Sequence, residues 1–293
     1  MVDKPVKKKR LPLTIVSNKK LLKNKIPIAR DKEKYYYIEK KDIPDDEVVT
    51  ELDVNDVVPI PYLDVQHNQR SAVYISAMSG SGKSTLCAKL VKEQLKLLKD
   101  EEIPDKPVER FDLKTRKKYI AMVPQHRKIV LITVTDNLDP AFESAFGNNP
   151  NFVHIPTSTD PDYLMFTMKN FAYCTVIFDD YENKNDKVTT AFTLGLITQL
   201  LEHSRKLHTH LFLLTHVTQN FNKTKDIIFE CSTFFTAPFS NKNSVKKFLK
   251  SYGDVSDEEI ETMIDDSMEE YTFLSFHKSY PRYYITYDKI ALL

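Results

Sequence analysis

Cysteine is scarce in this sequence of 293 residues. The three cysteines, Cys87, Cys174 and Cys231, are odd in number, far apart and set among apolar residues. This pattern argues against a disulfide framework and against a zinc cluster. We therefore expect three buried thiols and a reducing compartment.

Long apolar runs are also missing. No stretch approaches the roughly 18 to 20 apolar residues that a membrane-spanning helix needs. The chain begins with a lysine cluster and prolines rather than with the apolar core of a signal peptide. Apolar residues make up 41% and charged residues 28% of the chain, which is typical of a globular protein. We expect a soluble, unsecreted protein with one catalytic domain and terminal additions.

Glycine occurs only five times, and two of the five lie in one motif. Residues 76–85 read SAMSGSGKST, and they follow an apolar run at 72–76 (AVYIS). The next segment, residues 83–99, carries leucines at helical spacing. A strand, a Gly/Ser loop and a helix in this order predict a phosphate-binding loop.

The loop contains the groups that a triphosphate needs, which are close backbone N–H donors, a cation and a hydroxyl ligand for Mg²⁺. Gly80 and Gly82 permit the close approach, Lys83 supplies the charge and Ser84 supplies the hydroxyl. The motif departs from the usual pattern only at its first position, where Ala77 replaces glycine. The predicted nucleotide-binding residues are Ala77, Met78, Ser79, Gly80, Ser81, Gly82, Lys83, Ser84 and Thr85.

Apolar strands alternate with helical patterns downstream of this loop. The predicted strands are residues 128–135 (KIVLITVT), 152–155, 174–178 (CTVIF) and 211–215. The predicted helices lie near residue 141, after Asp160 and Pro161, and over residues 188–205. The alternation indicates an α/β fold with a mainly parallel sheet covered by helices on both faces. Residues 99–127 are charged and lack apolar periodicity, so we expect a surface insertion there.

Two acids follow the strand at residues 174–178, where a magnesium nucleotide site needs a carboxylate. We predict that Asp179 holds the metal together with Ser84. The adjacent Asp180 has the position of a base that polarises the attacking water. Glu182 is the alternative base, and both aspartates could instead simply cap the strand end.

Two further positions are candidates for catalysis. Thr215 and His216 end the strand at 211–215, where a polar side chain can sense the γ-phosphate, although His216 could simply begin a loop. Arg205 ends the preceding helix and could reach the nucleotide of a neighbouring subunit. A cation at a helix C-terminus explains Arg205 equally well.

The two ends of the chain differ in character from the centre. Residues 1–66 are predicted to form a basic tail and a small, partly β appendage, and residues 67–293 the catalytic domain. Residues 1–30 contain ten Lys or Arg and one acid, including PVKKKR at residues 5–10. This segment could contact nucleic acid, act as a nuclear import signal or remain a solvated tail.

The C-terminal region should contain two helices and a hairpin. Residues 243–252 should form a helix that stops at Gly253, and Ser256 to Glu259 have the spacing of a capping box. Residues 271–276 and 282–285 indicate a closing β-hairpin. The stretch 254–270 has nine acids and no Lys or Arg, as expected of either a solvated helix face or an interaction surface.

Together, these motifs resemble the FtsK-HerA superfamily of translocating ATPases, and within it the poxvirus-type DNA-packaging ATPases of large DNA viruses and virophages. The resemblance runs from about residue 64 to the C-terminus. It includes GSGKST, VIFDD, HSRKLHTHLFLLTH, KKFLKSYG and SFHKSYPRYYI. Two features depart from the family. Thr215 and His216 stand where glutamine or asparagine is common, with Gln219 and Asn220 only later, and residues 1–63 carry no part of the resemblance.

The resemblance implies a RecA-like P-loop core, an oligomeric ring, and hydrolysis of ATP with Mg²⁺ coupled to moving double-stranded DNA into a capsid. Capsid proteins would be partners, and the site of action would be the host cytoplasm at viral assembly sites, the nucleus, or the virion. Two other functions remain open. One is a monomeric P-loop NTPase or kinase, which would need a lid rich in arginine. The other is a nucleotide-switched binding module that uses residues 254–270.

Overall fold

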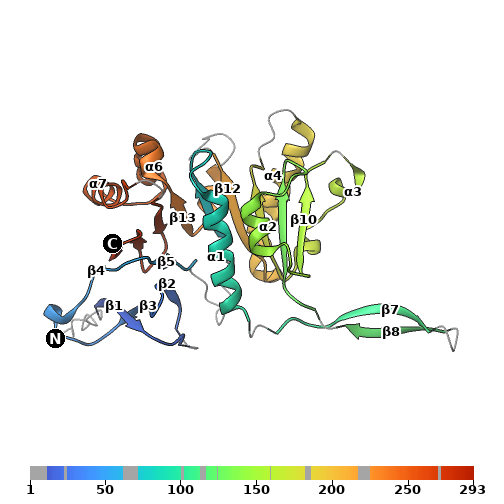
Figure 1. The fold of residues 1–293 in the computed structure, drawn as a ribbon, viewed down its shortest axis with the longest axis horizontal. Coiled ribbons are helices and arrows are strands. Elements are labelled where there is room, and N and C mark those ends of the chain that lie inside the picture. The colour runs from blue at the N-terminus through green and yellow to red at the C-terminus, as the bar shows by residue number, and fades with distance from the viewer. Residues whose placement is uncertain are drawn as a thin grey trace, which may run out of the picture.

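A ten-stranded sheet forms the centre of the computed structural model, which describes residues 12–22, 25–61, 72–99, 102–112, 117–123, 125–158, 160–181, 186–216, 225–269 and 272–293. Six neighbouring strands run parallel in the order β10, β9, β11, β12, β6, β13 (Figure 1). These strands are β6 (Ala72–Ser76), β9 (Lys128–Thr133), β10 (Phe152–Pro156), β11 (Cys174–Asp179), β12 (His210–Thr215) and β13 (Thr233–Thr236). Five of them match predicted strands, and the α/β fold class is confirmed.

Both faces of the parallel strands are buried, which explains their continuous apolar sequences. Alternate residues point to opposite faces. Val73 and Ile75 of β6 pack in one core with α1 (Lys83–Leu97) and α2 (Pro140–Phe146). Tyr74 of the same strand packs in the other core. The helices over that second face are α4 (Lys187–Leu207), α5 (Lys225–Glu230), α6 (Pro238–Tyr252) and α7 (Asp257–Asp265).

Antiparallel strands extend the sheet beyond β13. The predicted closing hairpin is present as β14 (Leu274–His277) and β15 (Tyr283–Ile285), and β16 (Lys289–Leu292) pairs with β15. The outermost strand, β4 (Glu51–Asp53), comes from the N-terminal region and pairs with β16. The sheet therefore joins residues from both ends of the chain.

The N-terminal region forms a second, four-stranded antiparallel sheet in the order β1, β3, β2, β5. Its elements are β1 (Leu13–Asn18), β2 (Pro27–Arg30), β3 (Tyr35–Lys40), the short helix η1 (Asp45–Glu47) and β5 (Val58–Pro59). A core that includes Ile15, Ile28, Tyr283 and Ile290 binds this sheet to the C-terminal strands. We call residues 12–61 the appendage. The predicted boundary at residues 66 and 67 lies outside the described residues.

The remaining elements refine the sequence predictions. The insertion at residues 99–127 contains a projecting two-stranded hairpin, β7 (Lys106–Asp112) and β8 (Lys117–Val123) (Figure 1). The helix predicted after Asp160 is only one turn, α3 (Pro161–Leu164), and η2 (Met168–Phe171) follows it.

Helices α6 and α7 differ in how well their starts were predicted. Helix α6 starts earlier than predicted and is broken at Asn241. The capping box of α7 is confirmed, because Ser256 Oγ accepts from Glu259 N at 3.2 Å and Glu259 accepts from Ser256 N at 2.6 Å.

All three cysteines are free and buried, as predicted. Every helix within the described ranges is too short or too polar to cross a membrane.

Candidate functional site

The phosphate-binding loop connects β6 to α1 as predicted. Gly80 and Gly82 have φ angles of 78° and 88°, in the left-handed region that glycine adopts without strain. A Cβ added at either glycine would meet no atom within 4 Å, so the space beside the loop is open. Gly82 is the N-cap of α1 and makes no side-chain cap, and the first turn contains no acid. The N-terminal amides and dipole of α1 therefore face an open cradle suited to an anion.

Lys83 is buried at the base of this loop, with 7% of its surface exposed. Its Nζ lies 3.3 Å from the carbonyl oxygen of Met78 and 3.0 Å from Nδ1 of His216. Burial lowers the pKa of Lys83, while Asp180 and Asp179 act in the opposite direction. The lysine is thus held by protein groups that phosphate oxygens could replace.

Asp179 lies at the carboxyl end of β11, on the same edge of the sheet as the loop. Burial is the largest cause that raises its pKa, to about 7, and Asp180 adds to the effect while Lys83 opposes it. A divalent cation beside this carboxylate would favour its ionised form. The carboxylate of Asp179 is therefore of a type and position suited to a divalent cation.

His216 connects Lys83 to Asp180. Its Nε2 lies 2.8 Å from Asp180 Oδ2, and its Nδ1 faces Lys83. An ammonium group can only donate, so Nδ1 accepts from Lys83 and Nε2–H donates to the carboxylate. The other carboxylate oxygen of Asp180, Oδ1, is buried and has no hydrogen-bond partner among the described residues. The start of α1 and the ends of β12 and β11 thus assemble one polar chain, Lys83–His216–Asp180.

The other predicted site residues occupy different positions. Thr215 is buried, and its carbonyl oxygen accepts the N–H of Ala77 at 3.3 Å. Arg205 is exposed in the last turn of α4, where the chain is about to enter β12. That is the opposite edge of the sheet from the loop, so the fold does not bring Arg205 to its own subunit's site. Glu182, Gln219 and Asn220 lie outside the described residues.

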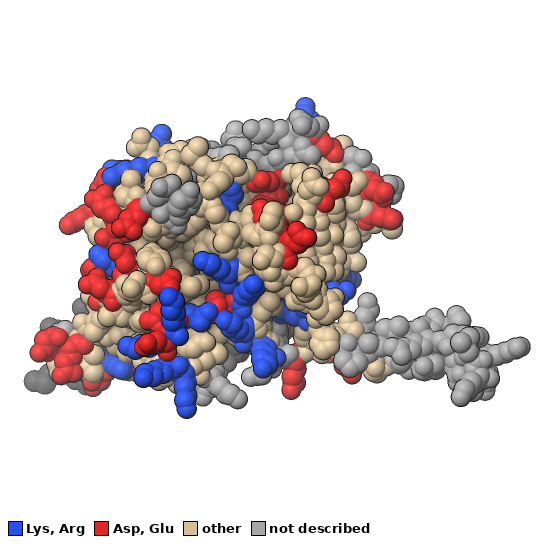
Figure 2. Space-filling view, in the orientation of Figure 1, with Lys and Arg blue, Asp and Glu red and all other residues tan. Residues whose placement is uncertain are grey.

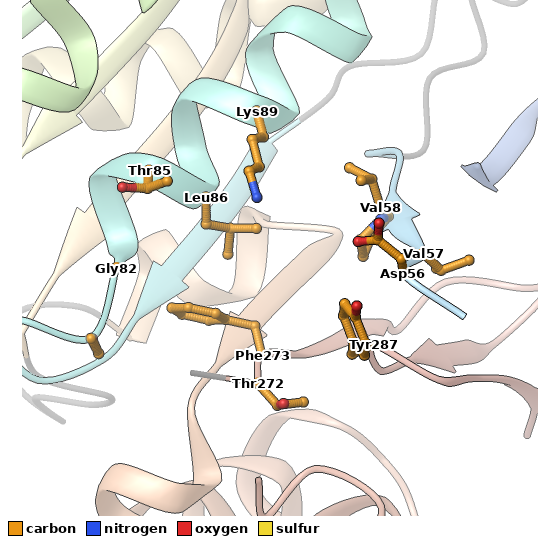
Figure 3. Close-up of a pocket in the computed structure, with 12 residues that line it drawn as sticks. Asp56, Val57, Val58, Gly82, Thr85, Leu86, Lys89, Thr272, Phe273 and Tyr287 are labelled. Atoms are coloured by element: carbon orange, nitrogen blue, oxygen red, sulfur yellow. The ribbon is translucent and has the colours of Figure 1, made fainter. Parts of the chain in front are cut away.

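Sequence reasoning missed a pocket of about 370 Å³ beside the phosphate loop (Figure 3). Figure 3 shows Leu86 and Lys89 of α1 facing Asp56 and Val58 across it, with Phe273 and Tyr287 below. Three separate parts of the chain line the pocket, namely Asp56, Val57, Val58 and Pro59; Ser81, Gly82, Thr85, Leu86 and Lys89; and Thr272, Phe273 and Tyr287. Since these parts are so distant in sequence, no local pattern could have indicated it.

Hydrogen bonds and ion pairs fix the appendage against this pocket. Val57 N donates to the carbonyl oxygen of Tyr287 at 3.2 Å, which joins the appendage to the C-terminal strands. Arg30 of β2 donates to Glu93 of α1 at 2.7 Å. Glu93 is buried, so this contact between the appendage and α1 is largely shielded from water. The appendage is therefore a wall of the pocket.

The fold and the loop define a P-loop nucleotide-binding domain. No family model matches the chain, and no curated protein matches it. Among solved structures, it is similar to the genome packaging NTPase B204 of Sulfolobus turreted icosahedral virus 2, at 12% identity and a TM-score of 0.42, over 74% of this chain and 96% of that one.

Two further solved structures are similar to this chain. The pCW3 conjugation coupling protein TcpA has 13% identity and a TM-score of 0.46, over 98% of this chain and 87% of that one. The type VII secretion ATPase EccC of Thermomonospora curvata has 11% identity and a TM-score of 0.45, over 92% of this chain and 28% of that one. At under 25% identity these likenesses concern the fold alone. With TM-scores below 0.5 they carry no argument about this chain's function.

Proposed function

We propose that this protein is an ATP-hydrolysing motor that translocates double-stranded DNA and packages a viral genome into a capsid. The observation that carries the ATPase part of the proposal is the polar chain from Lys83 through His216 to Asp180, assembled beside an open glycine cradle. Three groups lie at this one edge of the sheet. Lys83 would bind the nucleotide, Asp179 would position the metal and Asp180 would activate the water.

The pocket beside the loop suits the base of the nucleotide. Its volume of about 370 Å³ is within the usual range for small-molecule sites. Leu86 and Phe273 offer apolar surface, and Tyr287, which is 47% exposed, offers an aromatic ring for stacking. A triphosphate on the amides of the loop would place its adenosine toward this pocket, since Gly82 and Thr85 belong to both.

Ser84 and Asp179 would hold Mg²⁺, which when bound supplies positive charge to the β- and γ-phosphate oxygens. Lys83 exchanges its contacts with Met78 and His216 for phosphate oxygens. Asp180, whose Oδ2 accepts a hydrogen bond from His216 Nε2–H, would accept the proton of the attacking water. His216 then connects the region of the γ-phosphate to Asp180. In this position it senses the loss of the γ-phosphate after hydrolysis.

The DNA part of the proposal is supported by the resemblance of residues 64–293 to packaging ATPases and by the excess of Lys and Arg in residues 1–30. A ring of subunits would give Arg205 its role, because in one subunit it lies far from the loop. Capsid proteins complete the set of proposed partners. The proposed site of action is a viral assembly site in the host cytoplasm, the nucleus or the virion.

The test is ATP turnover with and without double-stranded DNA, at salt concentrations from about 50 to 300 mM. Wild-type turnover should rise with DNA, and the stimulation should fall steeply with salt because phosphate contacts release counterions. Lys83→Ala should abolish turnover. Lys206→Ala removes an exposed lysine at the opposite edge of the sheet and should behave as wild type.

Two results would count against the proposal in different ways. Absence of turnover in the wild type would refute the assignment of an ATPase site. Turnover that DNA never stimulates, even at low salt, would refute the motor and leave a monomeric NTPase or a nucleotide switch.

A further inference from the structure

Helix α1 carries a stripe of lysines on its exposed side. Lys89, Lys92 and Lys96 lie on the helix, and Lys99 lies just after it. The spacings of three, four and three residues place all four on one face, and all four are exposed. We call Lys89, Lys92, Lys96 and Lys99 the α1 lysine stripe.

The stripe is part of a larger basic surface. Figure 2 shows Lys and Arg side chains gathered over the region where α1 and the neighbouring N-terminal strands lie in Figure 1. The appendage contributes the exposed residues Lys19 and Lys20. Its Lys25 and Lys32 are also exposed, but they form ion pairs with Glu39 and Asp56. The basic segment at residues 4–10 joins the appendage directly in sequence.

The charge of the stripe is poorly compensated within the protein. Lys96 pairs with Glu93 at 2.9 Å, and Glu93 also binds Arg30. Lys92 lies over the ring of Phe146, with Nζ 5.9 Å from the ring centroid. Within the described ranges, Lys89, Lys92 and Lys99 make no ion pair.

A second lysine stripe provides the contrast. Helix α6 carries Lys242, Lys246 and Lys250 at spacings of four residues. Each forms an ion pair with an acid of α7, and these acids are Asp257, Glu261 and Asp265. The molecule therefore has two stripes of similar length, one neutralised internally and the other left as an exposed positive surface.

We propose that the α1 lysine stripe binds the phosphate backbone of double-stranded DNA. From Lys89 to its end at Leu97, α1 spans about 12 Å, and this length of duplex carries about seven phosphates. The proposal rests on the proposed function and specifies its DNA contact. The proposal also places the nucleotide and the DNA on the same helix. Helix α1 begins at the phosphate loop, and its residue Lys89 lines the proposed nucleotide pocket.

The test compares two triple variants of the full-length protein. Lys92→Gln, Lys96→Gln and Lys99→Gln remove three stripe lysines without touching the nucleotide pocket. Lys242→Gln, Lys246→Gln and Lys250→Gln change the net charge equally on α6. Binding to a duplex of random sequence is measured across salt concentrations, together with ATP turnover without DNA and thermal unfolding.

A plot of the logarithm of the binding constant against the logarithm of the salt concentration gives a slope. In the α1 variant, the magnitude of this slope should fall by about one for each lost phosphate contact, so by up to about three. At about 0.1 M salt, this corresponds to a loss of affinity of up to about 500-fold. Turnover without DNA and the unfolding temperature should match the wild type. The α6 variant should keep both the wild-type slope and the wild-type affinity.

Three outcomes would overturn the stripe proposal. One is equal DNA binding by the α1 variant and the wild type. Another is an equal loss in both variants, which would reflect net charge alone. The third is a change of oligomeric state in the α1 variant with DNA affinity per assembly intact, which would make the stripe a contact between copies. A wild type whose turnover is not stimulated by DNA would instead refute the proposed function itself.

Discussion

Replacing Asp179 with asparagine should stabilise the nucleotide-free protein, although it should weaken the magnesium nucleotide site. Burial raises the pKa of Asp179 to about 7, far above its value of 3.8 in an unfolded chain. The folded state therefore binds the proton more tightly than the unfolded state. Between these two pKa values, stability falls as pH rises, because ionisation is more costly in the folded protein.

The magnitude follows from the shift. A difference of about three pKa units corresponds to about 4 kcal/mol of lost stability above pH 7, as an upper bound for a half-buried group. Asparagine has a similar shape and never ionises. The stability advantage of Asp179→Asn over the wild type should therefore increase by about 2 to 3 kcal/mol between pH 5 and pH 8.

The assay is urea unfolding of both proteins at pH 5 and pH 8, first without ligand and then with a magnesium-bound, non-hydrolysable ATP analogue. The analogue should stabilise the wild type more than the variant, because a carboxylate holds the metal more strongly than a neutral amide oxygen does. Asp162→Asn, at an exposed position on α3, is the control. Its free energy of unfolding should differ from that of the wild type by the same amount at pH 5 and pH 8. A gap between Asp179→Asn and the wild type that is the same at both pH values would refute the reasoning.

Two further predictions concern individual groups of the site. Asp180→Asn should retain nucleotide binding and slow hydrolysis by about 100-fold or more if Asp180 is the base; the same behaviour in Glu182→Gln instead, measured by single-turnover kinetics, would assign the base to Glu182. Tyr287→Ala should raise KM for ATP by about 10-fold with little change in kcat, while Tyr287→Phe keeps the stacking ring and a KM near the wild-type value. An unchanged KM in Tyr287→Ala would place the adenine ring of ATP outside this pocket.

The sequence predicted those parts of the site whose signals are local. The phosphate loop is contiguous, and its glycines, lysine and serine each have a chemical reason at a fixed spacing. Asp179 and His216 could be assigned to the same edge because parallel strands end together at one edge of the sheet. The contact that joins His216 to both Lys83 and Asp180 is a tertiary feature, and only the structure shows it.

The parts that escaped prediction depend on distant residues or interrupted patterns. The nucleotide pocket joins Asp56 to Tyr287, and β4 pairs with β16 across almost the whole chain. The start of α6 was missed because Asn241 interrupts its helical geometry. Hairpin β7–β8 was missed because β7 (KPVERFD) is charged, and the short apolar run YIAMV of β8 lies in an otherwise charged segment.

Movement of DNA is the central claim, and displacement of a third strand tests it most directly. A duplex carrying a triplex-forming oligonucleotide is incubated with the full-length protein, Mg²⁺ and ATP. The account predicts that the wild type displaces the third strand with ATP, and that a non-hydrolysable analogue or the Lys83→Ala variant leaves it in place. Hydrolysis that DNA stimulates but that never displaces the third strand would contradict translocation.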